Sequence, residues 1–317
     1  MHVRLSFLML PYTRLELLHW DRLLSWAGAH WSAGQKPDWA IPPVTVRGKT
    51  HGFLMKLDRS DWCQRLTYFT GRYYELSVLR AMNLILRPGD HFVDIGANIG
   101  MMTLHGRGLV GAGGSVQSFE PNPPCAAALR DHLQLNGISN VAVHECALSD
   151  EPGTLTLSMT SEHSGTATLA DVGAQATRTV AVPVKVADSE ITIAPRLIKI
   201  DVEGFELQVL KGLRRTLAAH APFLITELIE EHLNKAGSTI SEVKAFLTGL
   251  GYEGFAIKQR RRRLRQRLVL KPLGAVGAED ASDVLWVHPS RKFDPTPYSS
   301  LAISSEPLGL RSFLPDA

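Results

Sequence analysis

The sequence predicts an α/β fold with a mostly parallel sheet and an antiparallel hairpin at one edge, and three observations support this prediction. From residue 91 onward, short apolar strands alternate with helices of about 10 to 15 residues, as in βαβ units. A glycine turn at 96–100 links the first of these strands to the helix after it. The last two strands, 252–258 and 284–288, have no helix between them, which predicts the hairpin.

The elements follow in chain order from their apolar patterns and from the residues that end them. Residues 72–86 have helical spacing, and this helix ends at Pro88-Gly89 because proline cannot continue a helix. Residues 150–186 alternate polar and apolar side chains, which indicates strands or an irregular insert. The predicted strands are 91–95, 115–119, 141–144, 197–202, 223–228, 252–258 and 284–288, and the predicted helices between them are 101–110, 126–136, 205–220 and 241–250.

Length and composition exclude several classes of protein. The chain has 317 residues, enough for about two domains, and its 44% hydrophobic content excludes a wholly disordered chain. No apolar run approaches the roughly 18 residues of a membrane-spanning helix. Cys63, Cys125 and Cys146 lie far apart, which argues against a disulfide scaffold or a structural zinc site and fits the reducing cytosol. We therefore expect a cytoplasmic protein and predict no metal site.

Basic residues are concentrated in one segment. The chain has 34 Lys and Arg against 31 Asp and Glu, but residues 254–278 hold eight of the basic residues and no acidic one. Without this segment, 26 basic residues face 31 acidic ones. The sequence therefore describes a mildly acidic body with one basic stretch, and this charge pattern argues against a generally basic nucleic-acid binder.

The first 40 residues hold four of the six tryptophans, and residues 15–24 place apolar side chains at helical spacing beside charged ones. We expect a helix that packs on the surface of the domain. A helix that lies on a membrane is a second hypothesis, because Trp and Leu beside basic residues suit a lipid interface. The basic stretch at 260–267 is the other place where a peripheral contact with a membrane is expected. A signal peptide is disfavoured, since the apolar run 5–10 is short and charged residues follow it.

The strongest local motif is VDIGANIG at 93–100, where a strand runs into a turn that opens a helix. Gly96 permits a tight turn and leaves room for a ligand against the backbone. Asp94 stands two residues before this glycine, and its carboxylate would repel the pyrophosphate of a dinucleotide. It would suit a cationic ligand with an ammonium and a sulfonium centre, such as S-adenosyl-L-methionine.

The next strand ends in Glu120, 20 residues after Gly100. A carboxylate at this position can accept hydrogen bonds from both hydroxyls of a ribose. Since NAD and S-adenosylmethionine both contain a ribose, Glu120 indicates a nucleoside ligand, and Asp94 favours S-adenosylmethionine. An NAD-dependent oxidoreductase is therefore disfavoured.

A third motif, KIDVEG at 199–204, follows the fourth strand of the parallel series. Lys199, Asp201 and Glu203 alternate with apolar residues in a position where unpaired charges are costly. They either form an ion pair between Lys199 and Asp201 that has no further role, or they orient an acceptor and take its proton. Glu227 ends the fifth strand and would face the same crevice, whereas His232 is expected at the surface.

Together, the runs DIGANIG, FEPNP, ALSD, KIDVEGFELQVLKG and ITEL resemble the FkbM-type family of S-adenosylmethionine-dependent methyltransferases. The resemblance spans about residues 71–289, KIDVEG is its most specific part, and GRYYE at 71–75 resembles the G-x-Y-E element before the core in this family. It implies a class I methyltransferase fold with a Rossmann-like, seven-stranded sheet. It also implies O-methylation of sugars, polyketide-type compounds or other small hydroxylated molecules.

The resemblance assigns residues to the cofactor. It places the turn 94–100 along the methionine moiety, Glu120 on the ribose and the turn 147–150 beside the adenine. One position departs from the family, which usually has Leu before Asp188 where this chain has Ala187. The predicted cofactor-binding residues are Asp94, Gly96, Ala97, Asn98, Gly100, Glu120, Pro121 and Ala147.

The predicted reaction is an in-line attack of an acceptor oxygen on the methyl carbon, helped by holding both reactants in position. Asp201 or Glu203 is the expected base, with Glu227 behind them. Lys199 would stabilise the developing oxyanion or orient Asp201. The expected acceptor is a hydroxylated small molecule, which includes glycans and lipid-linked compounds.

Two other functions stay open at this point. A nucleic-acid methyltransferase is suggested by Asn122-Pro123-Pro124, but this run follows the second strand and Cys125 is not aromatic. An inactive cofactor-binding or membrane-docked module is the other alternative. The predicted organisation is a Trp-rich extension and linker at 1–70, a methyltransferase domain at 71–290 and a flexible tail at 291–317, and the sequence has no signal for an oligomeric state.

Overall fold

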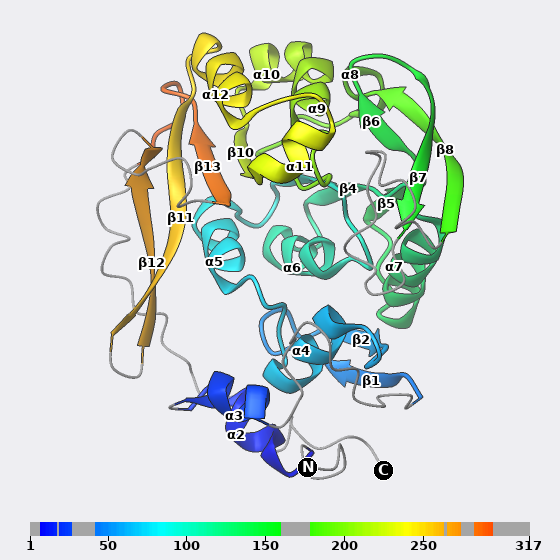
Figure 1. Cartoon of the computed structure of the whole chain (residues 1–317), viewed down its shortest axis with the longest axis vertical. Helices are drawn as coiled ribbons and strands as arrows, with labels where there is room; N and C mark the ends of the chain where they lie inside the picture. The colour runs from blue at the N-terminus through cyan, green and yellow to red at the C-terminus, as the bar shows by residue number, and fades with distance from the viewer. Residues whose placement is uncertain are drawn as a thin grey trace.

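A computed structural model describes residues 7–17, 19–26, 42–159, 178–262, 265–273 and 282–293 (Figure 1). Its centre is an eight-stranded sheet in the order β12-β11-β13-β10-β9-β3-β4-β5. The strands β10, β9, β3, β4 and β5 are parallel to one another, and β13, β11 and β12 pair in antiparallel fashion with β13 next to β10. The parallel strands are β3 (His91–Ile95), β4 (Ser115–Phe119), β5 (Val141–His144), β9 (Leu197–Ile200) and β10 (Phe223–Glu227). The antiparallel strands are β11 (Glu253–Arg262), β12 (Arg265–Pro272) and β13 (Asp283–Val287).

This topology confirms the predicted α/β class with a mostly parallel sheet and an antiparallel edge. The predicted number of seven strands is wrong by one, because β12 adds an eighth strand outside β11. In β12, Leu268 is buried and Leu270 packs against the core cluster that contains residues of the helix at 76–85. Burial of these apolar side chains stabilises the pairing of the Arg-rich segment with β11.

Helices cover both faces of the sheet. On one face, the core residues of the sheet pack against α9, α10 and α12, and on the other they pack against α5 and α6. The helices after residue 75 are α5 (Leu76–Ile85), α6 (Met101–Val110), α7 (Pro123–Leu135), α8 (Ala187–Glu190), α9 (Glu206–Gly212), α10 (Arg214–His220), α11 (Glu230–Lys235) and α12 (Ile240–Gly249). Apart from α8 and α11, these correspond to the predicted helices, with the helix predicted over 205–220 divided into α9 and α10.

The insert predicted within 150–186 is a small second sheet. It consists of β6 (Ala147–Ser149), β7 (Gly153–Met159) and β8 (Arg178–Val186), in the order β6-β8-β7. The part of the insert between β7 and β8 lies outside the described residues, as do residues 1–6, 18 and 27–41 of the N-terminal extension and the tail after residue 293.

The elements before residue 71 pack below α6 and α7 (Figure 1). They form a third apolar cluster together with residues of those two helices. These elements are a 3-10 turn (Phe7–Met9), α2 (Leu10–Arg14), α3 (Trp20–Trp26), β1 (Val44–Arg47), β2 (Leu54–Leu57) and α4 (Trp62–Thr70). The predicted domain boundary at residue 71 stays a prediction.

The chain order of the strands locates the site. From β3 the chain proceeds outward through β4 to β5, and it then returns to β9 on the other side of β3 and continues to β10. Ligands of such sheets bind beyond the carboxyl ends of the strands where this reversal occurs. Within the described ranges, no helix is both long and apolar enough to cross a membrane.

We predict that Gly212→Ala destabilises the fold. A Cβ at residue 212 would lie 2.1 Å from the carbonyl oxygen of Ser149 in β6, so α9 and the small sheet would have to separate. Overpacking of this kind lowers the free energy of unfolding by about 1–3 kcal/mol, measured by urea denaturation followed by circular dichroism.

Gly249→Ala in α12 is the matched control, since a Cβ there meets nothing within 4 Å. This change should leave the free energy of unfolding unchanged or raise it by up to about 1 kcal/mol. Equal stability of the two variants would contradict the close approach of α9 to β6.

Candidate functional site

A cavity of about 260 Å³ lies at the carboxyl ends of β3, β4, β9 and β10. Its other wall consists of residues from α4 and from the segment 73–75 that precedes α5. Ten of the twelve predicted site residues line this cavity, and Asp94 and Gly100 do not. The ten are Gly96, Ala97, Asn98, Glu120, Pro121, Ala147, Lys199, Asp201, Glu203 and Glu227.

The glycine turn after β3 forms the floor of one half of the cavity. Gly96 has φ +81°, and a Cβ there would lie 1.7 Å from the carbonyl oxygen of Asp201, so no other residue fits between the ends of β3 and β9. Gly100 has φ +91° and begins α6, where a Cβ would meet Leu129 of α7 at 2.2 Å. Gly100 therefore allows the turn to pack closely against α7, on the side away from the cavity. The turn presents its backbone to the cavity without a side chain at Gly96.

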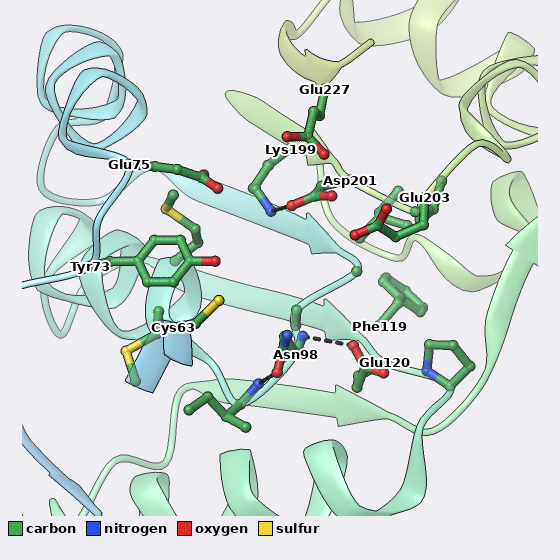
Figure 2. A pocket seen from close by; sticks show the side chains of 18 of the residues that line it. Cys63, Tyr73, Glu75, Asn98, Phe119, Glu120, Lys199, Asp201, Glu203 and Glu227 are labelled. Atoms are coloured by element: carbon green, nitrogen blue, oxygen red, sulfur yellow. Dashed lines mark hydrogen bonds and ion pairs between the residues drawn. The ribbon is translucent and has the colours of Figure 1, made fainter. Parts of the chain in front are cut away.

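Glu120 connects this turn to the end of β4 (Figure 2). One carboxylate oxygen accepts a hydrogen bond from the backbone N–H of Asn98 at 2.7 Å, and the other accepts one from Asn122 at 2.8 Å. Burial raises the pKa of Glu120 to about 7, although both hydrogen bonds oppose this. Each oxygen keeps a second lone pair, so the carboxyl can accept hydroxyl groups of a ligand in the cavity.

Asp94 lies behind the cavity wall. It is fully buried, its Oδ2 accepts a hydrogen bond from the Thr103 hydroxyl at 2.6 Å, and its Oδ1 has no hydrogen-bond partner among the described residues. Its neighbour across the sheet is Lys199 of β9. Burial raises the pKa of Asp94 and the charge of Lys199 lowers it. Asp94 therefore does not line the cavity, and its charge can act on a ligand there only across the cavity wall.

Lys199 is the cation at the centre of the other half of the cavity. Strand alternation places it on the face of β9 that also carries Leu197, toward α5. Its ammonium donates to Asp201 Oδ2 at 2.8 Å (Figure 2). Burial alone would lower the pKa of Lys199, but the charges of Asp201, Asp94 and Glu75 outweigh it and raise the pKa. The ion pair expected from the sequence is therefore present, and Lys199 stays charged.

Glu203 is held by a residue that the sequence placed at the surface. His232 of α11 lies with Nδ1 2.7 Å from Glu203 Oε2, and this bond raises the pKa of His232. Glu203 has φ +53°, and the Gly204 beside it has φ +113° with the carbonyl of His232 against it. The turn after β9 is thus fixed by α11, which no local sequence signal predicted.

Glu227 faces several other carboxyl groups. Burial and the charges of Asp201, Glu75 and Asp283 raise its pKa to about 11, so Glu227 is protonated at neutral pH and can donate a hydrogen bond. Oxygen atoms of Asp201, Glu203 and Glu227 lie within 4.8 Å of one another. In the described part of the chain, this is the one group of acidic, His or Cys residues whose spacing could hold a metal ion. Lys199 and His232 already pair with two of its members.

Several residues of the cavity were not assigned from the sequence. Tyr73, Tyr74 and Trp62 form an aromatic wall, in which the rings of Trp62 and Tyr74 lie 5.2 Å apart and those of Tyr73 and Tyr74 4.5 Å apart. Glu75 precedes α5 and faces Lys199 (Figure 2), and burial raises its pKa to about 8. The GRYYE run was a usable signal for three of these residues, whereas nothing in the sequence links Trp62 to the site.

Asp283 adds a further carboxyl group next to Glu227. The two residues are cross-strand partners between β13 and β10. Burial and the charge of Asp201 raise the pKa of Asp283 to about 7. This half of the cavity therefore holds more carboxyl groups than it has cations to pair with them, which suits a positively charged ligand.

Comparison with known proteins agrees with this arrangement. A family model described as the methyltransferase FkbM domain matches residues 94–253. A methyltransferase 1 from Beauveria bassiana (strain ARSEF 2860) is 31% identical over 149 residues, which cover 40% of this chain and 59% of that protein. The 31-O-demethyl-FK506 methyltransferase FkbM of Streptomyces tacrolimicus is 46% identical over 68 residues, which cover 22% of this chain and 25% of that protein.

Among solved structures, a methyltransferase FkbM from Methylobacillus flagellatus KT is 17% identical and has a TM-score of 0.42. The match covers 72% of this chain and 53% of that one. In each of these three comparisons, the match spans less than two thirds of the relative's length.

The carboxyl groups of the site predict a fall in stability between pH 7 and pH 9. Folding raises the pKa of Glu120 and Asp283 to about 7 and that of Glu75 to about 8, mainly through burial. In the unfolded chain these groups titrate near pH 4. Their contribution to stability is complete below that pH and is lost as the pH rises through 7 to 8, because the folded state binds more protons. We expect the free energy of unfolding to fall by at least about 1 kcal/mol, measured by urea denaturation.

The measurement starts at pH 7 because burial lowers the pKa values of His51 and His105. Below pH 7 these two residues make the free energy of unfolding rise with pH, which opposes the effect of the carboxyl groups. Glu75→Gln should flatten the decline, since glutamine cannot ionise. Glu231→Gln on the surface should not change it. A free energy of unfolding that stays constant or increases between pH 7 and pH 9 would contradict the pKa shifts.

Proposed function

This chain belongs to the FkbM family of methyltransferases, and on that premise we propose that it transfers a methyl group from S-adenosyl-L-methionine to a hydroxyl of a small acceptor. One observation carries the proposal. A single cavity joins the glycine turn and Glu120 to the cluster around Lys199 and Asp201, so that a nucleoside cofactor and an acceptor can lie in contact.

The residues present fit this cofactor. The bare backbone at Gly96 and the carboxyl of Glu120 provide a turn for the amino-acid part and acceptors for the ribose hydroxyls. Asp94, with an unpartnered buried oxygen, and the surplus of carboxyl groups favour a ligand with positive charge. When bound, S-adenosylmethionine supplies an electrophilic methyl group on a sulfonium. Ala147 and Pro121 complete this half of the wall.

We assign the role of base to Asp201. Glu227 is protonated at neutral pH and therefore acts as a donor that orients the acceptor oxygen. Glu203 is bound to His232, which fixes the turn. Asp201 lines the cavity and is oriented by Lys199 at 2.8 Å, and the same lysine stabilises negative charge as the acceptor loses its proton.

The acceptor class follows from the opposite wall. Trp62, Tyr73 and Tyr74 offer an apolar aromatic surface, and carboxyl groups that can hydrogen-bond hydroxyls lie across from it. This combination suits a hydroxylated ring, such as a sugar or a natural product. The name of the Streptomyces tacrolimicus relative, a 31-O-demethyl-FK506 methyltransferase, supports a hydroxyl as the methyl acceptor.

We further propose that the reaction occurs in the cytoplasm and that the N-terminal segment contacts a membrane surface. Leu8, Tyr12, Leu15 and Leu17 are exposed in the described part of this segment, with Leu8 78% exposed. Sedimentation with phosphatidylglycerol vesicles tests the contact. Binding that Leu8→Ser and Leu15→Ser leave unchanged would contradict it.

We predict that Glu120→Ala weakens binding of S-adenosylhomocysteine by at least about tenfold, because charged hydrogen bonds are lost. Titration calorimetry measures the affinity, with Lys185→Gln on the surface as the control and NAD as a ligand that should not bind. Glu120→Gln still accepts a hydrogen bond, so its affinity for S-adenosylhomocysteine should lie between those of the wild type and Glu120→Ala. Unchanged affinity in Glu120→Ala would refute the role of Glu120 at the ribose.

The proposed reaction is tested with labelled S-adenosylmethionine and a panel of sugars, macrolides, RNA and DNA, with products identified by mass spectrometry. We expect methylation of a hydroxylated small molecule. Asp201→Asn should lower turnover by at least about 100-fold, as for loss of a general base, while S-adenosylhomocysteine still binds. Methylation of nucleic acid alone would overturn the assignment of a small-molecule acceptor. Full turnover of Asp201→Asn would overturn the assignment of Asp201 as the base.

A further inference from the structure

The aromatic wall of the cavity lies outside the residues that match the family model and is held from behind by the N-terminal segment. We propose that Glu16 is a positioning residue of the acceptor site, which acts through Arg72 to fix the backbone of Tyr73 and Tyr74. This inference rests on the proposed function, which assigns the aromatic wall to the acceptor site. The effect of Glu16 on the backbone of Tyr73 and Tyr74 can be tested without any methyl transfer.

Arg72 connects the two parts directly. Its guanidinium binds both carboxylate oxygens of Glu16, with Nε to Oε1 and Nη2 to Oε2 at 2.8 Å each. The remaining nitrogen, Nη1, donates to the backbone carbonyls of Tyr73 at 2.7 Å and Tyr74 at 3.1 Å. Arg72 is 3% exposed, so these four bonds replace nearly all of its contact with water. Arg72 can hold the carbonyls of the wall in this geometry only while Glu16 holds Arg72.

Glu16 is itself fixed from two sides. Lys49 bonds to the Glu16 carboxylate, and its ammonium also donates to the Arg14 carbonyl at 2.8 Å. The backbone N–H of Lys49 donates to the carbonyl of Gly71 at 2.7 Å. Burial alone would raise the pKa of Glu16, but its bonds with Arg72 and Lys49 lower it to about 2. The carboxylate therefore stays ionised at every pH at which the protein would be assayed.

The position of these carbonyls decides where the rings lie. The segment 73–75 links α4 to α5 and carries Tyr73, Tyr74 and Glu75 into the cavity within three consecutive residues. The ring of Tyr74 packs on Trp62 of α4 at 5.2 Å, and Glu75 directly precedes α5. A shift of this short segment moves the aromatic wall and one carboxyl group together, on the side opposite Asp201 and Lys199.

A contact of α2, which ends at Arg14 just before Glu16, provides a matched control. The hydroxyl of Thr13 in α2 donates to the carbonyl of Phe69 at 2.7 Å and has no bond to Arg72. Thr13→Val removes this bond with little change in shape. It weakens the attachment of α2 but leaves the Glu16–Arg72 pair in place, so it separates general docking of the segment from the specific ion pair.

The first measurement is hydrogen–deuterium exchange of the full chain without acceptor. In Glu16→Gln, we expect amides of residues 73–76 to exchange about tenfold faster, with little change at 96–100. Thr13→Val should leave exchange at 73–76 as in the wild type. Faster exchange there in Thr13→Val, or unchanged exchange in Glu16→Gln, would overturn the proposal.

The second measurement is the kinetics on the acceptor found in the methylation assay. Glu16→Gln should raise the KM for that acceptor by about tenfold and change kcat by less than about threefold. Its affinity for S-adenosylhomocysteine should stay within about threefold of the wild type. A loss of kcat with unchanged KM would contradict a positioning role. Failure to methylate any acceptor would refute the proposed function, and the exchange experiment would still decide the role of Glu16.

Glu16→Gln leaves the buried charge of Arg72 without its partner and can therefore unfold the chain. In that case the double variant Glu16→Gln/Arg72→Gln is used, which removes the buried charge of Arg72 and leaves Lys49 its bond to the Arg14 carbonyl. It should show the same faster exchange at 73–76. Wild-type exchange in a folded double variant would overturn the proposal.

Discussion

The close approach of β3 and β9 is the constraint on which the site depends. Gly96 lies against the carbonyl of Asp201, so the ends of the two strands meet without a side chain between them. This contact brings the cofactor turn next to the KIDVEG turn, although about 100 residues of sequence separate the two. It also aligns Asp94 with Lys199 across the sheet. The two halves of the cavity are adjacent because these two strands are neighbours.

Lys199 is the cation that pairs with the carboxyl groups in the half of the cavity next to the KIDVEG turn. It pairs with Asp201 and also lowers the pKa values of Asp94, Glu75 and Asp283 relative to what burial alone would give. One lysine cannot balance all of these carboxyl groups, so Glu227 keeps its proton at neutral pH. Neighbouring acids therefore differ in state, since Asp201 is paired with a cation and Glu227 carries a proton that it can donate to a hydrogen bond.

The cavity combines parts with different origins in the chain. The matched residues 94–253 contribute the glycine turn, Glu120 and the KIDVEG turn. Earlier residues contribute the aromatic wall, and partly buried ion pairs between residues 16, 49 and 72 connect this wall to the N-terminal segment. The wall opposite the sheet is therefore formed by residues that lie outside the range matched by the family model.

The sequence by itself determined the α/β class, the glycine turn and ten of the residues that line the cavity. These features are local, since strand and helix periods, glycine turns and acids at strand ends are visible within a few residues. Tertiary structure decided the features that depend on contacts between distant segments: the eighth strand, the burial of Asp94 behind the wall, the pairing of His232 with Glu203, and the position of Trp62. The same holds for protonation, because the pKa of Glu227 depends on its burial and on the other carboxyl groups that the fold brings near it.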